Sequence, residues 1–221
     1  PLLLQSAKEL SADFFCQRRE LGVLNIGARG AIAVDGQNYA MDARDGLYIG
    51  RGSKEIRFSS ENPADPARFY LVSFPAHASY PTRHARWADA EAQKLGSPEA
   101  ANARTIYRYI HERGIQSCQL VMGFTVLEPG SVWNTMPPHT HDRRMEVYLY
   151  FDMAANARVF HLMGSMQETR HIVVADSQVV ISPSWSIHSG VGTSRYTFCW
   201  GMGGENQTFE DMDGIEIGDL R

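Results

Sequence analysis

The sequence predicts an all-β protein, and three observations support this fold class. Short apolar runs are separated by turn residues roughly every 8 to 12 positions, which is typical of sandwiches and barrels. Asp35-Gly36 is a two-residue hairpin signal between two such runs. Leu120–Leu127 and Val147–Phe151 are continuous apolar runs of the kind that forms buried strands. The 221 residues are enough for one large all-β domain or for two small ones.

In the first half of the chain, most expected strands are bounded by recognisable turns. We expect strands at residues 17–26, 31–34, 37–41, 45–50, 54–59 and 68–74. Asn62–Pro66 is the turn that precedes the last of these. Trp87–Leu95 is rich in Ala, Glu and Gln and is followed by Gly96, so we expect a short helix there.

The second half continues as strands and ends in a polar tail. We expect strands at residues 105–110, 120–127, 147–151, 158–163, 172–174, 178–182 and 196–201. Glu128–Ser131 is the turn that ends the second of these. The tail, residues 204–221, is polar and acidic, and we expect it to lie on the surface or against a neighbouring subunit.

Charge and cysteine content exclude several classes of partner. The formal net charge of −4 gives no strong attraction to nucleic acid or to a membrane, and no apolar run reaches transmembrane length. Cys16, Cys118 and Cys199 have no paired spacing, which indicates neither a disulfide framework nor a zinc ribbon and fits the cytoplasm. The chain begins with proline rather than methionine, so we expect that the natural N-terminus lies further upstream.

Four potential metal ligands stand at an informative spacing. His139 and His141 are two residues apart, so on a strand they point to the same face, and Glu146 follows after room for a bend. His188 ends a short apolar run that contains Pro183. Imidazole nitrogen and carboxylate oxygen are ligands of zinc and similar cations, and the inner wall of a small barrel would bring the four together. We therefore predict a metal site of His139, His141, Glu146 and His188.

This spacing, His-x-His-x4-Glu followed by Pro-x4-His, resembles the two motifs of the cupin family. The resemblance implies a bicupin, with two cupin-like β-barrels and short connecting helices. We expect a truncated N-terminal barrel at residues 1–75, a linker with a short helix at 76–104, and a metal-binding barrel with the tail at 105–221. In the first barrel, Asp13 and Phe15 stand where the His-x-His pair would fall, so we expect no metal ligands there.

Further runs are similar to those of the 5-keto-4-deoxyuronate isomerase family. They are residues 18–23, 134–148, 167–173, 181–193 and 200–207. The resemblance implies a cytoplasmic homohexamer with one zinc ion per subunit at the same four positions. It also implies a role in pectin degradation, through the interconversion of 5-dehydro-4-deoxy-D-glucuronate and 3-deoxy-D-glycero-2,5-hexodiulosonate. This reaction moves a carbonyl from carbon 1 to carbon 2 of an acidic sugar.

Such a carbonyl shift needs a general base, and the acidic sugar needs a group that recognises its carboxylate. The candidate bases are titratable residues in the family-like runs, namely Glu168, His171 and Glu205. The candidate carboxylate ligands are arginines, whose fork suits bidentate binding, namely Arg143, Arg144 and Arg170. Trp133 and Trp185 are candidate apolar walls for the sugar. The structural alternatives are surface ion pairs for the arginines and core positions for the tryptophans.

Three alternatives fit the same motifs. Iron accepts the same ligands, so an iron-dependent cupin dioxygenase is one, and metal analysis with oxygen-uptake measurements separates it from an isomerase. A non-catalytic sugar-binding cupin is another, which would bind the sugar without converting it. A zinc ion that is partly structural is the third, because closed four-ligand zinc sites are most often structural.

Overall fold

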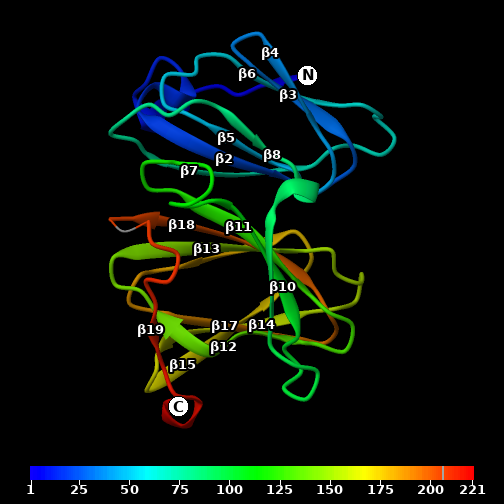
Figure 1. The fold of residues 1–221 in the computed structure, drawn as a ribbon, viewed down its shortest axis with the longest axis vertical. Coiled ribbons are helices and arrows are strands. Elements are labelled where there is room, and N and C mark those ends of the chain that lie inside the picture. The colour runs from blue at the N-terminus through cyan, green and yellow to red at the C-terminus, as the bar shows by residue number, and fades with distance from the viewer. Residues whose placement is uncertain (206) are drawn as a thin grey trace. The chain divides into compact units, whose positions relative to one another are not determined.

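A computed structural model describes residues 1–205 and 207–221, and most of its regular elements are β-strands (Figure 1). The strands are β1 (Leu2–Leu3), β2 (Arg19–Asn25), β3 (Gly30–Val34), β4 (Gln37–Met41), β5 (Gly46–Ile49), β6 (Ile56–Ser60), β7 (Phe69–Pro75), β8 (Arg83–Ala85), β9 (Glu91–Leu95), β10 (Arg104–Ile110), β11 (Val121–Leu127), β12 (Trp133–Thr140), β13 (Arg144–Phe151), β14 (Val159–Ser165), β15 (Glu168–Val174), β16 (Gln178–Ser182), β17 (Ile187–Gly192), β18 (Thr197–Gly204) and β19 (Asp213–Gly214). The helical segments are short 3-10 turns, η1 (Lys8–Leu10), η2 (Phe15–Gln17), η3 (Trp87–Asp89) and η4 (Ile217–Asp219). The predicted all-β class is confirmed.

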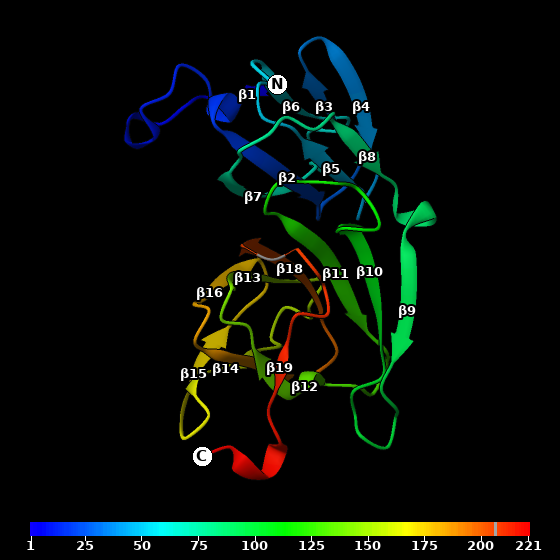
Figure 2. The same ribbon diagram turned by 60° about the vertical axis from the view of Figure 1, so that its left-hand side comes forward.

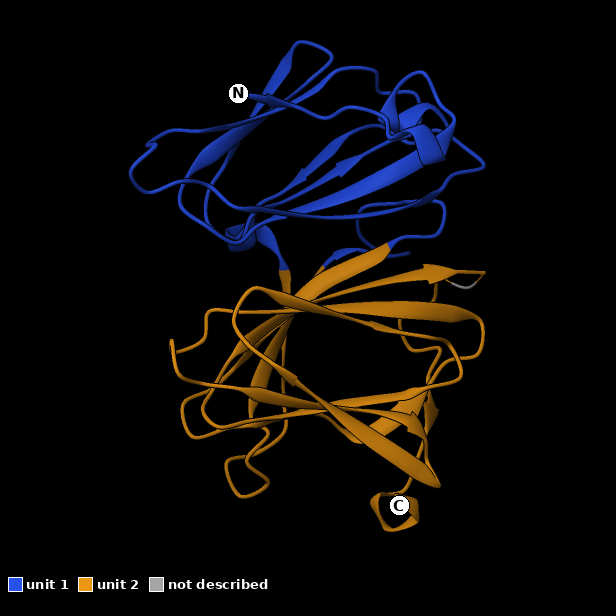
Figure 3. Ribbon diagram, turned by 180° about the vertical axis from the view of Figure 1, so that it is seen from behind, with its two compact units in different colours: residues 1–90, 109–120 blue, residues 91–108, 121–221 orange. Residues whose placement is uncertain are grey.

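The chain divides into two compact units, coloured separately in Figure 3. Unit 1 consists of residues 1–90 and 109–120, and unit 2 consists of residues 91–108 and 121–221. The segment 76–104, predicted as a linker, contributes β8 and η3 to unit 1 and β9 to unit 2. Within the described residues, no helix is long and apolar enough to cross a membrane.

Unit 1 is built from two antiparallel sheets that pack over a common apolar core. Their strand orders are β1-β6-β3-β4 and β7-β2-β5-β8. The core joins Leu21 of β2 and Leu47 of β5 to Ile32 of β3 and Phe58 of β6, as expected when alternate residues of each strand point inward. The hairpin predicted at Asp35-Gly36 is confirmed, because both residues have the positive φ that a two-residue type I′ turn requires, 48° and 86°.

Unit 2 repeats this plan with longer strands and carries the predicted metal ligands. Its two antiparallel sheets have the orders β16-β13-β18-β11-β10-β9 and β15-β14-β17-β12-β19. Buried aromatic side chains of β13 and β18, among them Tyr150 and Phe198, pack with Val159 of β14 between the sheets. In Figure 2, β9 runs beside β10 at the edge of the larger sheet, as the antiparallel register requires.

The helix predicted at Trp87–Leu95 is wrong. The structure has only the 3-10 turn η3 followed by the strand β9, whose five side chains are all exposed. The reason is tertiary, because the Arg108 guanidinium on the neighbouring strand β10 holds the side chains of Glu91 and Gln93 at 3.1 and 2.8 Å. Residues two apart face one side of a strand, so this pairing requires the extended form and overrides helix propensity.

Candidate metal centre

Two paired strands of the smaller sheet bring the first and last predicted ligands together. His139 near the end of β12 lies directly opposite His188 of β17 in the antiparallel register. The register of this pair shifts between Asn134 and His139, where the chain passes through Pro137 and Pro138. Proline has no N–H to give to the ladder, so the irregularity follows from the sequence.

The other two ligands come from the turn after β12 and from the larger sheet. His141 follows the last residue of β12, and Glu146 lies on β13 between Ser182 of β16 and Met202 of β18. Glu146 is 4% exposed and His141 only 1% exposed. The four side chains therefore meet between the two sheets of unit 2.

The donor atoms of this His139/His141/Glu146/His188 cluster all lie within 4.8 Å of one another. The Nε2 atoms of His139 and His188 are 3.0 Å apart. Oε2 of Glu146 lies 3.0 Å from Nε2 of His141 and 3.0 Å from Nε2 of His188. Three imidazole nitrogens and one carboxylate oxygen thus point toward a common centre, as the ligand spacing predicted.

Neighbouring groups set the orientation of two of the imidazoles. Nδ1 of His141 is 2.9 Å from the carbonyl oxygen of Arg144, so this nitrogen carries the proton and donates it. Nδ1 of His188 lies 3.3 Å from Oγ of Ser182. A ring whose Nδ1 donates a hydrogen bond presents an unprotonated Nε2, which is the form that binds a metal ion.

The pKa values of the cluster follow from burial and mutual contact. Burial, together with the nearby His188, lowers the pKa of His139 to about 3, so this ring is neutral. Burial alone would raise the pKa of Glu146, but the charges and hydrogen bonds of His188 and His141 hold it well below its usual value. Burial alone would lower the pKa of His141, but the hydrogen bond to Glu146 outweighs burial, so the pKa is raised. The cluster thus has a carboxylate and a neutral imidazole ready to act as ligands.

The chemistry of the donor set fits a divalent cation. Zinc takes nitrogen and oxygen ligands at about 2.0–2.2 Å, which places neighbouring donors roughly 3.3 Å apart in a tetrahedron. The three contacts of 3.0 Å in the cluster approach this separation. A buried carboxylate among unprotonated imidazole nitrogens also gains most from a positive ion, because burying it without one is costly.

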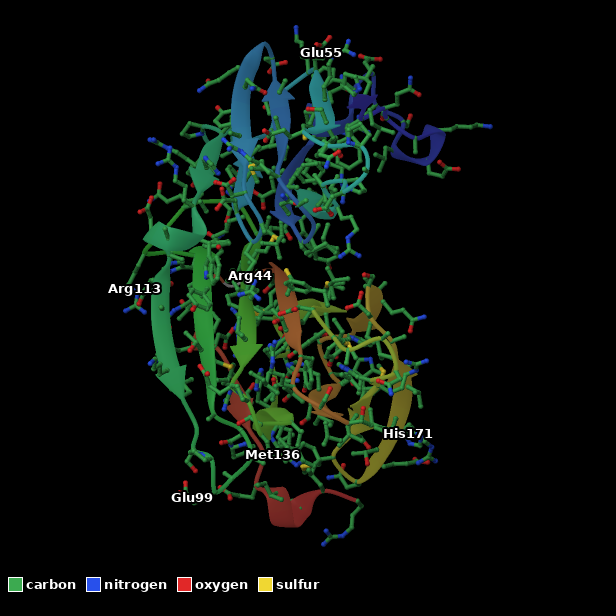
Figure 4. All side chains as sticks on the ribbon, turned by 90° about the vertical axis from the view of Figure 1, so that its right-hand side faces the viewer. Arg44, Glu55, Glu99, Arg113, Met136 and His171 are labelled. Atoms are coloured by element: carbon green, nitrogen blue, oxygen red, sulfur yellow. The ribbon has the colours of Figure 1, made fainter. Side chains whose placement is uncertain are left out.

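A cavity of about 250 Å³ lies beside the cluster. His139 and Glu146 of the cluster form part of its lining. Its wall is mostly apolar and comes entirely from unit 2, namely Leu95, Ile106, Met136, Pro137, Phe198, Trp200, Met202, Phe209 and Met212, with the polar Arg104, Thr125, Thr135 and Tyr148. Met136 is labelled in Figure 4. An apolar cavity with a few convergent polar groups is the usual form of a small-molecule site.

The three candidate bases do not line this cavity. Glu168 is exposed on β15 and pairs with Arg170, which is also exposed. His171 is exposed on the same strand (Figure 4), and its ring centroid lies 5.8 Å from that of Phe160. Glu205 is exposed after β18, and its backbone N–H donates to the carbonyl of Arg143. Their role as general base stays a prediction.

The three candidate carboxylate ligands also lie outside the cavity lining. Arg143 pairs with Asp211, and Arg170 pairs with Glu168. Arg144 is buried and donates to three backbone carbonyls, those of Thr208 at 2.6 Å, Phe209 at 2.9 Å and Asp211 at 3.1 Å. Arg144 therefore fixes the segment that carries the cavity residue Phe209, rather than facing the cavity.

The aromatic side chains of the cavity wall are not the two tryptophans that the sequence indicated. Trp133 is half-buried on β12, and Trp185 is 61% exposed; neither lines the cavity. Trp200 and Phe209 form the wall instead, with ring centroids 5.2 Å apart. The polar residues of the lining, Arg104, Thr125, Thr135 and Tyr148, were not among the candidates either, and Arg104 stands one position before the strand predicted at 105–110. If the strand predicted at 105–110 is extended by one residue toward the N-terminus, Arg104 points to the same face as Ile106.

Comparisons of the sequence with known proteins agree with these features. The model of the KduI/IolB family matches residues 2–216. A protein of Caldicellulosiruptor bescii is 54% identical over 220 residues, and one of Halalkalibacterium halodurans is 57% identical over 221. Each match covers 100% of this chain and 80% of the relative, and both relatives are named 4-deoxy-L-threo-5-hexosulose-uronate ketol-isomerase.

Comparisons of the structure show the fold alone, because the sequence identities are low. An IolB-like protein of Salmonella typhimurium aligns with a TM-score of 0.75 at 13% identity, over 97% of this chain and 82% of that one. Oxalate decarboxylase of Lactobacillus farciminis aligns with a TM-score of 0.62 at 10% identity, over 91% and 74%. The all-β fold of this chain thus recurs in proteins with little sequence in common.

Proposed function

Because this chain belongs to the KduI/IolB family and is an isomerase, we propose that it interconverts 5-dehydro-4-deoxy-D-glucuronate and 3-deoxy-D-glycero-2,5-hexodiulosonate. The relatives that share more than half of its residues along its whole length carry the name of this ketol-isomerase. The reaction removes a proton beside a carbonyl and returns it one carbon away. The substrate is a small acidic sugar released from pectin or a similar polyuronide.

The metal in this proposal is one zinc ion per subunit, held by His139, His141, Glu146 and His188. The observation that carries the proposal is the convergence of these donors within 4.8 Å beside a cavity. When bound, zinc supplies a Lewis acid that polarises the carbonyl oxygen and so eases removal of the neighbouring proton. Only His139 and Glu146 of the four reach the cavity, so the substrate would approach from their side.

The chain's own residues would bind the sugar and exclude water from it. The apolar wall formed by Trp200, Phe209 and Met212 shields the reacting carbons from solvent, where a displaced proton would be lost. Tyr148 and Thr135 supply hydroxyl groups on the same wall, with their oxygens 3.5 Å apart. Such hydroxyls suit hydrogen bonds to the sugar's own hydroxyl groups.

We expect the protein to act as a cytoplasmic homohexamer. The three cysteines are buried and free, which suits a reducing compartment. Several apolar side chains are exposed on β15, on β16 and in the turn after it, which suits a surface covered in an assembly, namely Ile172, Val173, Val179, Ile181 and Trp185. Light scattering coupled to size exclusion tests this expectation, and a monomer at micromolar concentration would contradict it.

An assay of the purified protein with 5-dehydro-4-deoxy-D-glucuronate tests the reaction directly. We expect NMR to identify 3-deoxy-D-glycero-2,5-hexodiulosonate as the product, with no oxygen consumed and with close to one zinc per chain by elemental analysis. Turnover coupled to oxygen uptake with bound iron would favour the dioxygenase instead. Binding of the sugar without conversion would favour a non-catalytic sugar-binding protein.

A further inference from the structure

Arg104 is a cationic side chain in a cavity wall that is otherwise mostly apolar. It is the first residue of β10, and its side chain lines the cavity together with His139 and Glu146 of the metal cluster. Its apolar neighbours on the wall include Leu95 and Ile106. A positive charge in such a wall needs a physical reason, because removing a guanidinium from water is costly.

The hydrogen bonding of Arg104 leaves it without an anionic partner. Its Nη1 donates to the carbonyl oxygen of Asn102 at 2.9 Å, and within residues 1–205 and 207–221 no carboxylate forms an ion pair with it. Arg143, by contrast, pairs with Asp211, and Arg144 is occupied by backbone carbonyls. Of these three arginines, Arg104 is therefore the one that lines the cavity and, among the described residues, has no carboxylate beside it.

The chemistry of a guanidinium specifies what it would bind there. It has five N–H donors in a planar fork, and one donor satisfied by Asn102 leaves others for two parallel bonds to a carboxylate. Burial lowers the pKa of Arg104 because its charged form loses hydration, and an anionic partner would offset that cost. A sugar with a carboxylate at one end would supply such an anion.

We propose that Arg104 binds the carboxylate of the substrate and so directs the opposite, carbonyl-bearing end toward His139 and Glu146. This inference rests on the proposed isomerase function and adds the residue that selects acidic sugars. The carboxylate at carbon 6 takes no part in the shift between carbons 1 and 2. Holding it at Arg104 places the reacting carbons at the metal cluster, and binding energy from the unreactive end serves to orient the reactive one.

The test compares Arg104→Met with the unchanged, zinc-loaded protein on two sugars. One is the deoxyuronate, and the other is its carboxamide, which has the same shape without the charge. We expect Arg104→Met to lower kcat/KM for the deoxyuronate roughly 100- to 1,000-fold, as the loss of a buried charge pair does, and to change the value for the carboxamide less than about threefold. The ratio of the two values reports charge recognition, which a purely structural role would not alter.

Two further variants control this comparison. Arg158→Met removes an exposed arginine that also donates to a nearby carbonyl, that of Ala157, and that lies outside the cavity lining. We expect it to match the unchanged protein on both sugars. Arg104→Lys keeps the charge without the fork, so we expect a preference for the carboxylate between those of the unchanged protein and Arg104→Met.

Calorimetric binding of both sugars, with zinc content measured in parallel, separates this inference from the proposed function. If the unchanged protein binds the deoxyuronate but does not convert it, the proposed reaction fails while the role of Arg104 is still tested by affinity. A preference for the carboxylate that survives unchanged in Arg104→Met or in Arg104→Lys would overturn the assignment. An equal loss of affinity for both sugars in Arg104→Met, with full zinc content, would also overturn it.

Discussion

Each of the two units buries a glutamate that follows a pair of arginines, and the two glutamates have different surroundings. Glu20 of unit 1, on β2, is fully buried. It accepts hydrogen bonds from the Tyr48 hydroxyl at 2.8 Å and from the backbone N–H groups of Cys118, Gln119 and Leu120 at 2.7, 2.7 and 2.8 Å. A backbone N–H group can only donate a hydrogen bond, so these three groups satisfy the carboxylate without any bound ion. The same hydrogen bonds anchor the segment 117–120 to the sheet.

Glu146 of unit 2 has imidazoles where Glu20 has backbone N–H groups. His141 and His188 each place Nε2 at 3.0 Å from the same carboxylate oxygen, and Nδ1 of each ring already has a partner. With a cation bound, an imidazole in that orientation would offer its Nε2 lone pair as a ligand. Glu146 is therefore a candidate metal ligand and Glu20 is not, because only Glu146 has potential ligands as neighbours.

Removing a ligand from unit 2 should have the largest effect. For His141→Ala, we expect bound zinc to fall from about one to below about 0.1 per chain and kcat/KM to fall roughly 100-fold or more. Changing a residue that only orients a ligand already costs 10- to 100-fold. Elemental analysis and the isomerase assay measure both quantities. Full zinc content in this variant would remove His141 from the site.

Changing the glutamate of unit 1 should affect stability but not metal. In Glu20→Gln, the amide turns an N–H toward the backbone donors of the segment 117–120, so we expect the free energy of unfolding to fall by about 2–5 kcal/mol. Zinc per folded chain should not change. Urea denaturation followed by fluorescence measures the first quantity. Unaltered stability would contradict the structural role of Glu20, and zinc loss from the folded variant would mean that Glu20 also affects metal binding.

A milder change at the same place separates the hydroxyl donor from the backbone donors. Tyr48→Phe removes one of the four donors to Glu20 and keeps the three backbone donors, so we expect a loss of about 1–1.5 kcal/mol in the free energy of unfolding. The same denaturation experiment measures it. A loss as large as that of Glu20→Gln would mean that the hydroxyl, rather than the backbone donors, holds the carboxylate.

The smallest effect is expected at an exposed residue of unit 1. By the resemblance to the cupin motifs, Lys54 stands near the position where a last histidine would fall in the first half of the chain, and its side chain is exposed. We expect Lys54→Ala to change the free energy of unfolding by less than about 0.5 kcal/mol and to leave zinc content unaltered. A measurable loss of zinc would mean that unit 1 takes part in metal binding.

The convergence of the four potential ligands could be predicted from the sequence, because it depends largely on local spacing. His139, His141 and Glu146 lie on one strand–turn–strand segment, where the side-chain period of two limits where each can point. His188 was found through its distance from Pro183. The hairpin at Asp35-Gly36 was found for a similar reason, since a two-residue turn is set by its own residues.

The cavity could not be predicted in the same way, because contacts between distant segments form it. Arg104, Trp200 and Phe209 come from three separate parts of the chain and meet only in the folded unit. Proximity in sequence favoured Arg143 and Arg144 as substrate ligands, yet the tail that follows β18 occupies both of them. The same tail brings Phe209 and Met212 to the cavity. The polar composition of the tail gave no sign of this contact.

We propose that His139, His141, Glu146 and His188 hold one zinc ion beside the cavity. Crystals of the purified protein, measured with X-rays just above and just below the zinc absorption edge, test it most directly. We predict one strong anomalous peak per chain, within bonding distance of all four side chains and present only above the edge. A peak at the iron edge in its place, or no peak among these residues in active protein, would contradict it.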